Sequence, residues 1–127
     1  MLMKDRIIAA ISSKLKQIYS EGTIYLDSVM QSTKDFYFVL SVMEAGTENV
    51  GIDVQNMAFL VDIALVDNKK DDELINRLVS RCGTFFNVLE IEGNTIFPEE
   101  YLPDKVDGVQ HIRFTVAFPQ YIEWSEE

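Results

Sequence analysis

Three consecutive acidic residues, Asp71, Asp72 and Glu73, have side chains of the kind that bind divalent cations or act as general acids. A calcium-binding loop requires alternating acidic residues, a central glycine and a distal glutamate. The segment 67–73 has neither this spacing nor the glycine. The three residues precede an apolar pattern of helical period, and the first turn of a helix favours anions. We therefore interpret them as a helix N-terminus and predict no metal-binding residue.

Cys82 and His111 are the residue types that could supply a nucleophile and its base. Each is the only residue of its type, so the chain can form neither an internal disulfide nor a His/Cys zinc site. Cys82 falls on an apolar helical stripe beside Leu78 and Phe86, where burial raises the pKa of a thiol and makes it inert. His111 alternates with Arg113 along a predicted strand, which favours a solvent-facing or interface position.

No further pattern in the sequence indicates catalysis or cofactor binding. The glycines are isolated and match neither of the glycine-rich motifs that bind nucleotides. Glu99 and Glu100 are adjacent in a predicted loop, which does not preorganise two carboxylates as an acid–base pair. We therefore expect a protein that is not an enzyme, with no catalytic residues and no cofactor.

The composition indicates a soluble globular protein. The chain has 127 residues, 47% apolar and 25% charged, and we predict one domain over residues 1–127. Its net charge of −10 disfavours binding to nucleic acid and to anionic membranes. The longest apolar region, around Met57–Val66, is interrupted by Asp62 and is too short to span a membrane. The N-terminal residues do not resemble a signal peptide, so the expected location is a reducing cytoplasm.

Two segments show the period of amphipathic helices. The first covers about Lys4–Ser20, and we expect Gly22 to end it in the left-handed conformation, which glycine adopts without a Cβ clash. The second covers about Lys69–Asn87, with Asn68 as its N-cap. Gly83 inside this helix indicates either close packing or an early end. The apolar stripes comprise Ile7, Ile8, Ile11, Leu15 and Ile18 in the first helix and Leu74, Ile75, Leu78, Val79, Cys82, Phe85 and Phe86 in the second.

Apolar residues at alternating positions predict two long strands. Asp35–Met43 and Val50–Val66 have apolar side chains on both faces and pair most simply as an antiparallel hairpin, joined by a loop at Glu44–Asn49. A shorter strand, Thr23–Asp27, precedes them. Apolar character on both faces indicates strands that are interior or that another copy of the chain covers.

The last third of the chain contains further strands. Val88–Glu92 and Asn94–Phe97 are short, and the pair Asp107–Gly108 is typical of a two-residue hairpin turn. The final strand follows this turn until Pro119 ends it, and residues 119–127 form an acidic, frayed tail. The order of the elements predicts an α/β (α+β) sandwich, with a largely antiparallel mixed sheet and two helices packed on one face.

Several segments together carry a resemblance to a known family: the amphipathic opening Ile7–Ile11, the short strand Ile24–Tyr25, the aromatic segment Asp35–Phe38, the helix start Asp71–Leu74 and, most specifically, the stretch Val106–Phe114. In this order they resemble the tail-terminator, or tail-completion, proteins of tailed phages, prophages and phage-tail-like particles. The resemblance covers nearly the whole chain and implies a sheet that carries the two helices.

The resemblance also implies a structural virion protein without cofactor or reaction. Such a protein caps the end of the tail tube as a six-fold ring, stops tube polymerisation and offers the surface that the head joins. The implied partners are other copies of itself in a homohexamer, the tail-tube protein, the head–tail connector or neck protein and, in contractile tails, the sheath. Specific nucleic-acid binding and membrane binding are not implied. The implied location is the head-proximal end of the virion tail, after synthesis in the cytoplasm of the bacterial host.

The residues expected to contact neighbouring rings or subunits lie in the polar segment 44–56 and near the C-terminus. Tyrosine and tryptophan past the last predicted strand are amphipathic and typical of interfaces. The polar segment departs from the family, whose members are more basic there, because it carries Glu48 and Asp53. The candidate interface residues are Glu44, Thr47, Glu48, Asn49, Asp53, Gln55, Tyr121 and Trp124.

Two other functions are compatible with the sequence. A neck or head-completion protein of the same assembly pathway has a similar size and also forms rings. A monomeric cytoplasmic adaptor or inhibitor would use its acidity to bind a basic target surface. An enzyme is less favoured than either, because it requires a convergent polar pocket of which the sequence gives no sign.

Overall fold

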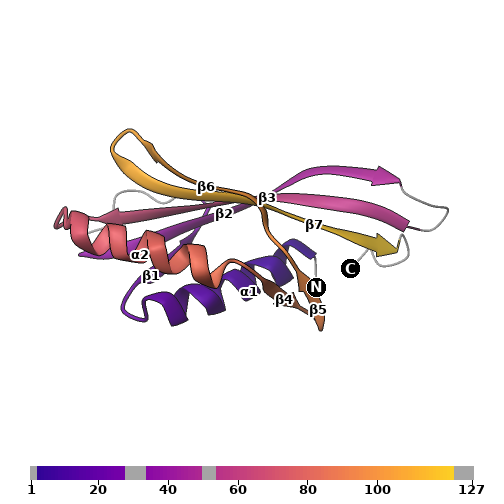
Figure 1. The fold of residues 1–127 in the computed structure, drawn as a ribbon, viewed down its shortest axis with the longest axis horizontal. Helices are drawn as coiled ribbons and strands as arrows, with labels where there is room; N and C mark the ends of the chain where they lie inside the picture. The colour runs from indigo at the N-terminus through magenta and orange to yellow at the C-terminus, as the bar shows by residue number, and fades with distance from the viewer. Residues whose placement is uncertain (1–2, 28–33, 50–53, 122–127) are drawn as a thin grey trace.

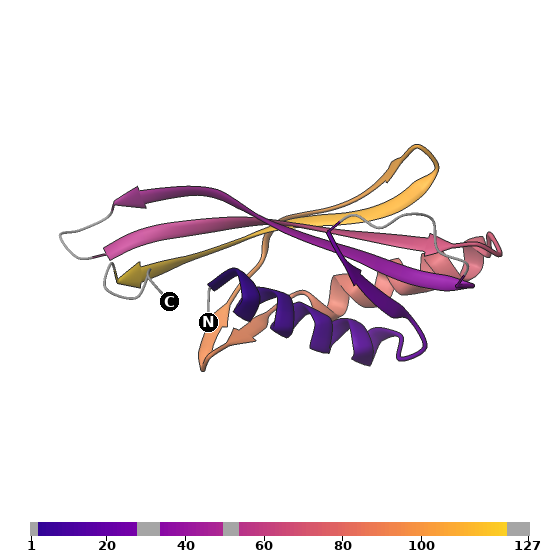
Figure 2. The same cartoon turned by 180° about the vertical axis from the view of Figure 1, so that it is seen from behind.

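The computed structural model describes residues 3–27, 34–49 and 54–121. In chain order the helices and strands are α1 (Met3–Ile18), β1 (Thr23–Leu26), β2 (Phe36–Asn49), β3 (Val54–Asp67), α2 (Asp72–Phe85), β4 (Leu89–Ile91), β5 (Asn94–Ile96), β6 (Glu99–Val106) and β7 (Val109–Tyr121). Five strands form one sheet in the order β1-β2-β3-β7-β6, and β4 and β5 form a separate hairpin (Figures 1 and 2). β1 is parallel to β2, and the other neighbouring strands of the sheet are antiparallel.

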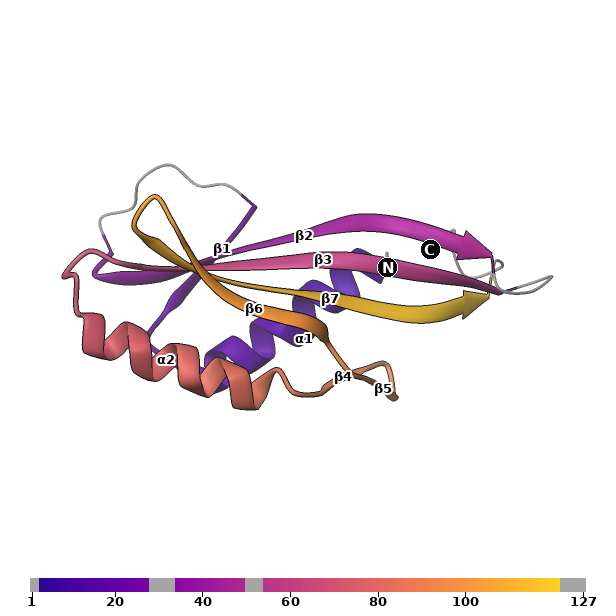
Figure 3. The ribbon, with the colours of Figure 1, turned by 45° about the horizontal axis from the view of Figure 1, so that its top comes forward.

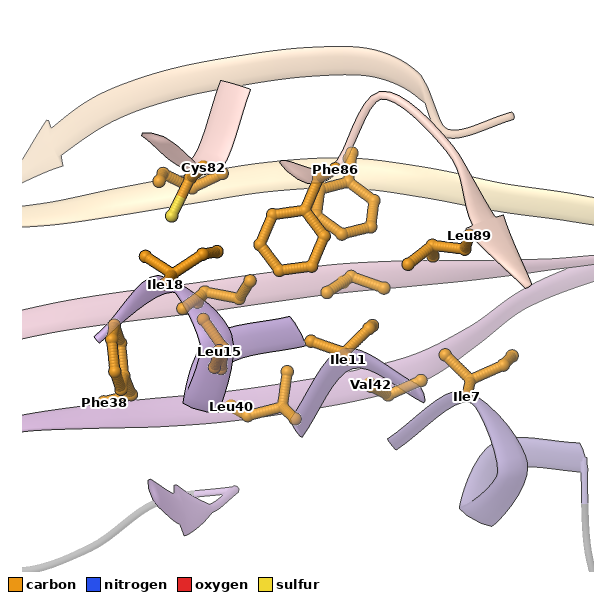
Figure 4. Packing of buried hydrophobic residues seen from close by; sticks show 14 of the residues in the cluster. Ile7, Ile11, Leu15, Ile18, Phe38, Leu40, Val42, Cys82, Phe86 and Leu89 are labelled. Atoms are coloured by element: carbon orange, nitrogen blue, oxygen red, sulfur yellow. The ribbon is translucent and has the colours of Figure 1, made fainter. Parts of the chain in front are cut away.

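Both helices bury their apolar stripes against the same face of the sheet, which confirms the predicted sandwich (Figures 1 and 4). Helices of this length are marginal in water, so this packing is what stabilises them. The Phe86 ring, just after α2, lies 5.2 Å from the Phe114 ring of β7 and thereby ties the helix layer to the centre of the sheet. The buried residues of the helices are Ile7, Ile11, Leu15 and Ile18 in α1 and Ile75, Leu78 and Cys82 in α2.

The prediction of a loop at Glu44–Asn49 is wrong, because these residues continue β2. The β2–β3 register extends to Asn49, which lies opposite Gln55, with a bulge between Glu44 and Gly46. The apolar alternation that identifies the strand in the sequence stops just before this segment. Backbone pairing with β3 does not depend on apolar side chains, and the ladder therefore runs on without them. The predicted antiparallel hairpin itself is confirmed.

The prediction that Pro119 ends the last strand is also wrong, since β7 continues to Tyr121. β6 accompanies β7 only as far as Glu99, which lies opposite Thr115. Among the described residues, Pro119 therefore lies where β7 has a neighbour on one side alone, opposite Asn56 of β3. Proline is tolerated on such an edge, because its missing N–H belongs to the unpaired side. The remainder of the predicted acidic tail lies outside the described residues.

Asp71, and not Asn68, is the N-cap of α2. The Asp71 carboxylate accepts a hydrogen bond from the Leu74 N–H at 3.1 Å. Asn68 instead donates to backbone carbonyls at the start of β2, from Nδ2 to Lys34 at 2.6 Å and from its N–H to Asp35 at 2.8 Å. Asn68 thus ties the turn after β3 to the strand beside it, and the acidic cluster occupies the first turn of α2 as predicted.

Gly22 follows α1 but does not adopt the predicted left-handed conformation, since its φ is not positive. The structural reason for a glycine here is close packing: a Cβ at this position would lie 2.6 Å from Cε2 of Phe38. Positive φ occurs instead at other positions, among them the predicted hairpin turn. Asp107 and Gly108 join β6 to β7 with φ of 51° and 80°, which confirms that turn. The predicted pair of short strands is confirmed as the β4–β5 hairpin.

We expect Gly22→Ala to destabilise the fold by about 1–3 kcal/mol, because the added methyl group overlaps the fully buried Phe38 ring. Gly83→Ala is the matched control, since its Cβ would make an ordinary contact 3.7 Å from the Tyr101 hydroxyl. Alanine is favoured over glycine inside a helix by about 1 kcal/mol, so this variant should gain stability. Urea unfolding followed by circular dichroism measures both changes. A Gly22→Ala variant as stable as the wild type would contradict the close packing.

Candidate functional site

Cys82 and His111 lie on opposite sides of the sheet and cannot act as a nucleophile and its base. Cys82 belongs to α2 and is fully buried in the core (Figure 4). Burial raises the pKa of its thiol from 9.0 to about 12, and the Arg81 guanidinium opposes this shift only in part. His111 lies on β7 between the buried Gln110 and Ile112, so its own side chain faces away from the helices.

The acidic residues before α2 stabilise the helix N-terminus. The Asp67 carboxylate accepts hydrogen bonds from the backbone N–H groups of Lys69 at 3.1 Å and Asp71 at 2.8 Å. Glu99 and Glu100 are exposed on β6. Within residues 3–27, 34–49 and 54–121, no group of three His, Cys, Asp or Glu side chains is placed to hold a metal ion. In the same residues, no helix has the length and apolar character needed to cross a membrane.

The face of the sheet opposite the helices, which we call the open face, has a row of polar side chains at its centre. His111 Nδ1 lies 2.8 Å from Asp62 Oδ1, and because a carboxylate can only accept, Nδ1 donates. The Arg113 guanidinium lies 4.0 Å from Asp62 and 4.0 Å from Asp104. These side chains are partly exposed, and ion pairs of this kind add at most about 1 kcal/mol of stability. The row is therefore a surface feature and adds little to the stability of the core.

Large apolar side chains flank this polar row. Met43 of β2 and Leu60 of β3 lie opposite each other in the register and are 60% and 39% exposed. Leu102 of β6 lies opposite Arg113 and is 53% exposed. Exposed apolar side chains interspersed with charged ones are typical of protein–protein interfaces. The open face can thus bind another protein surface, and among the described residues it contains no arrangement suited to covalent chemistry.

The distal halves of β2, β3 and β7 project beyond the helices as a three-stranded arm (Figure 3). We define the arm by the ranges 44–49, 54–58 and 117–121. Neither β1 nor β6 reaches it, because β1 pairs with β2 no further than Leu40 and β6 leaves β7 at Thr115. The arm is therefore the part of the fold best placed to reach a neighbouring molecule.

The arm contains most of the candidate interface residues. In the register Asn49 lies opposite Gln55, which in turn lies opposite Gln120, and Val54 lies opposite Tyr121. Strand pairing thus brings Asn49, Gln55 and the end of β7 together at the tip of the arm, although the end of β7 is far from the other two residues in the sequence. The structure places there Thr47, Glu48, Asn49, Gln55 and Tyr121, puts Glu44 at the base of the arm beside the bulge, and leaves Asp53 and Trp124 outside the described residues.

The polar row on the open face was not predicted from the sequence. The signals were present, because Asp62 interrupts an apolar strand and His111 and Arg113 share one side of another. Their proximity depends on β3 lying next to β7, and that neighbour relation cannot be inferred from the pattern of either strand. Met43 and Leu60 were identified as strand residues, but the helices cover the other face.

Comparisons with known proteins relate the chain to one family. A sequence model of a family described as "phage tail terminator protein" matches residues 6–127. A solved structure with 14% sequence identity matches 92% of this chain and 94% of its own, with a TM-score of 0.52. At this identity the likeness to the solved structure concerns the fold alone. No curated protein matches the chain in sequence.

We expect Cys82 to resist alkylation in the native protein. With a pKa of about 12 rather than 9.0, the fraction of reactive thiolate near pH 8 is roughly a thousandfold lower, and it rises only as the pH approaches the raised pKa. Mass spectrometry after treatment with N-ethylmaleimide should show an adduct in urea and none under native conditions over the same time. Rapid labelling of the native protein would contradict the burial of this thiol and reopen the question of a nucleophile.

Proposed function

The chain belongs to the phage tail terminator family, and we propose on this basis that it caps the end of a tail tube as a ring, stops tube polymerisation and offers the surface that the head joins. The family is one of structural proteins, and the chain is accordingly a component of the virion tail that takes part in tail assembly. The observation that carries the proposal is the extent of the family match, which begins in the first turn of α1 and includes α2 and every strand of the sheet.

The proposed mechanism is one of competing surfaces. A tube grows by stacking rings, so each added ring presents the same end to the next one. A terminator must bind that end with one surface and present a different surface on its other side, so that no further tube ring can add. Ring formation requires a heterologous interface, in which a patch of one copy binds a different patch of the next copy. No bond is made or broken, and no cofactor takes part.

The charge of the protein suits this proposed role. A ring on a tail tube surrounds the path of the phage DNA, and the net charge of −10 keeps an anionic polymer from adhering to the ring. The proposed partners are other copies of the chain, most simply in a homohexamer, the tail-tube protein, the head–tail connector or neck protein and, in a contractile tail, the sheath. The proposed location is the head-proximal end of the tail.

The proposed contact region is the tip of the arm together with the segment that follows β7. Because strand pairing gathers the described residues of the tip at one end of an elongated sheet, they can reach a neighbouring ring or subunit without disturbing the helix-covered core. The residues proposed for these contacts are Glu44, Thr47, Glu48, Asn49, Asp53, Gln55, Tyr121 and Trp124.

The capping activity can be tested with the tail-tube protein of the same phage. We expect the chain to bind tube ends and to shorten the tubes that form in its presence, as measured from length distributions in negative-stain electron micrographs. A variant in which a two-residue Asn-Gly turn replaces residues 49–55 should keep the fold, since Glu48 still faces Asn56 as a hydrogen-bonded pair in the register, and should lose capping.

Two further variants separate an effect of the arm tip from an effect of charge. Glu48→Lys changes the charge at the tip, and Glu90→Lys makes the same change on the exposed side of β4. We expect only the first to reduce capping.

Retention of the wild-type chain by a connector but not by tubes would indicate a neck protein instead. A chain that remains monomeric in the presence of tube ends would contradict a ring altogether.

A further inference from the structure

The two outer strands of the sheet protect only its helix-covered half. β1 pairs with residues 37–40 of β2, and β6 pairs with β7 up to Thr115. Beyond these points β2 continues to Asn49 and β7 to Tyr121, and among the described residues β3 is the only strand that pairs with either. The arm thus has two free edges, one on β2 and one on β7. A free strand edge presents unpaired backbone groups and is a template for pairing with another chain.

The backbone groups at the β2 edge can be identified from the register. The Leu40 carbonyl accepts from the Asp27 N–H at 2.7 Å on the β1 side, so the backbone groups of Leu40 point away from β3. In an antiparallel ladder this direction alternates, and the bulge after Glu44 shifts the alternation by one residue. Past the bulge, the N–H and C=O groups of Thr47 and Asn49 therefore point to the free edge.

The β7 edge differs in its hydrogen-bonding capacity. The same alternation, carried across β3, turns Val116 toward β3 and turns Ala117, Pro119 and Tyr121 toward the free edge. Pro119 has a carbonyl but no N–H, so the middle of this edge can accept a hydrogen bond but cannot donate one. The β7 edge therefore fits best against a strand that supplies donors.

We propose that neighbouring copies in the ring are joined by direct strand pairing, with the free edge of β2 in one copy against the free edge of β7 in the next. This inference deepens the proposed function and rests on it. In this arrangement the N–H groups of Thr47 and Asn49 lie along the edge at which Pro119 has a carbonyl but no N–H. Pairing of like edges, β7 with β7, would oppose two prolines and lose two donors.

The directions of the strands also agree with a ring. β2 and β7 are both antiparallel to β3 and therefore run the same way. A rotation that lays the next sheet alongside the first keeps these directions, so the junction is parallel, whereas pairing of like edges about a two-fold axis is antiparallel and ends in a dimer. Three arm strands from each of six copies give a closed barrel of about 18 strands, a size that leaves an aqueous channel. Closure removes both free edges of every copy.

Proline substitutions at the two edges test the pairing. Thr47→Pro and Ala117→Pro each remove one edge N–H that no described strand uses, so both variants should fold, as measured by circular dichroism and thermal unfolding. We expect each to lose rings and tube capping in electron micrographs. Lys105→Pro is the matched control: it removes an N–H on the outer side of β6, next to Pro103, and should leave rings and capping unchanged. Intact rings in both arm variants would overturn the proposal while leaving the capping function standing.

Cross-linking tests the choice of edges without relying on the proline variants. Thr47→Cys and Gln120→Cys chains, whose altered positions fall on the same face of the sheet in the register, are mixed, assembled on tube ends and treated with a short bis-maleimide, while the buried Cys82 stays unreactive. We expect cross-links between the two variants and none within either variant alone. Cross-links of Thr47→Cys chains to each other, or of either variant to the tube protein, would overturn the proposal. Failure of the wild-type chain to form rings or to cap tubes would overturn the proposed function as well.

Discussion

The burial of two helical stripes on one face of the sheet is the constraint on which the rest of the structure depends. α1 and α2 have 16 and 14 residues, so at ~1.5 Å per residue they are ~24 and ~21 Å long. β2 and β3 have 14 residues each, and at ~3.3 Å per residue they extend over ~46 Å. Helices that lie along the strands can therefore cover only about half of the sheet. The arm exists because β2 and β3 are longer than the helices that pack against them.

The elements inside the helix-covered half could be predicted from the sequence, and so could the arm part of β3, but the full extent of β2 and β7 in the arm could not. Burial leaves a periodic trace, and the stripe from Ile7 to Ile18 and the alternation before Met43 were recognised from it. The continuation of β2 past Glu44 is held by backbone pairing with β3, which leaves no such trace. The prediction that β7 ends at Pro119 was wrong for a related reason: a proline ends a strand only where the ladder needs a backbone N–H at that position.

The features of the candidate site also differ in whether they could be predicted from local sequence. The absence of a Cys82–His111 pair was correctly inferred from the apolar stripe around the cysteine, which is a local property. The row formed by Asp62, His111 and Arg113 depends on two strands that are separated by α2 and by the β4–β5 hairpin, and only the three-dimensional order of strands reveals it. The candidate residues of the arm tip were found from polarity, but their gathering at one end of the sheet required the register.

The position of β7 at the end of the described chain has a consequence for synthesis. β3 is synthesised well before β7, yet β7 pairs with the second edge of β3. The aromatic ring of Phe114 in β7 also packs against that of Phe86. A ribosome must therefore translate as far as Tyr121 before either the core or the arm can be finished. A nascent chain that stalls earlier lacks β7, and with it the Phe114 ring of the core and the strand that pairs with the second edge of β3.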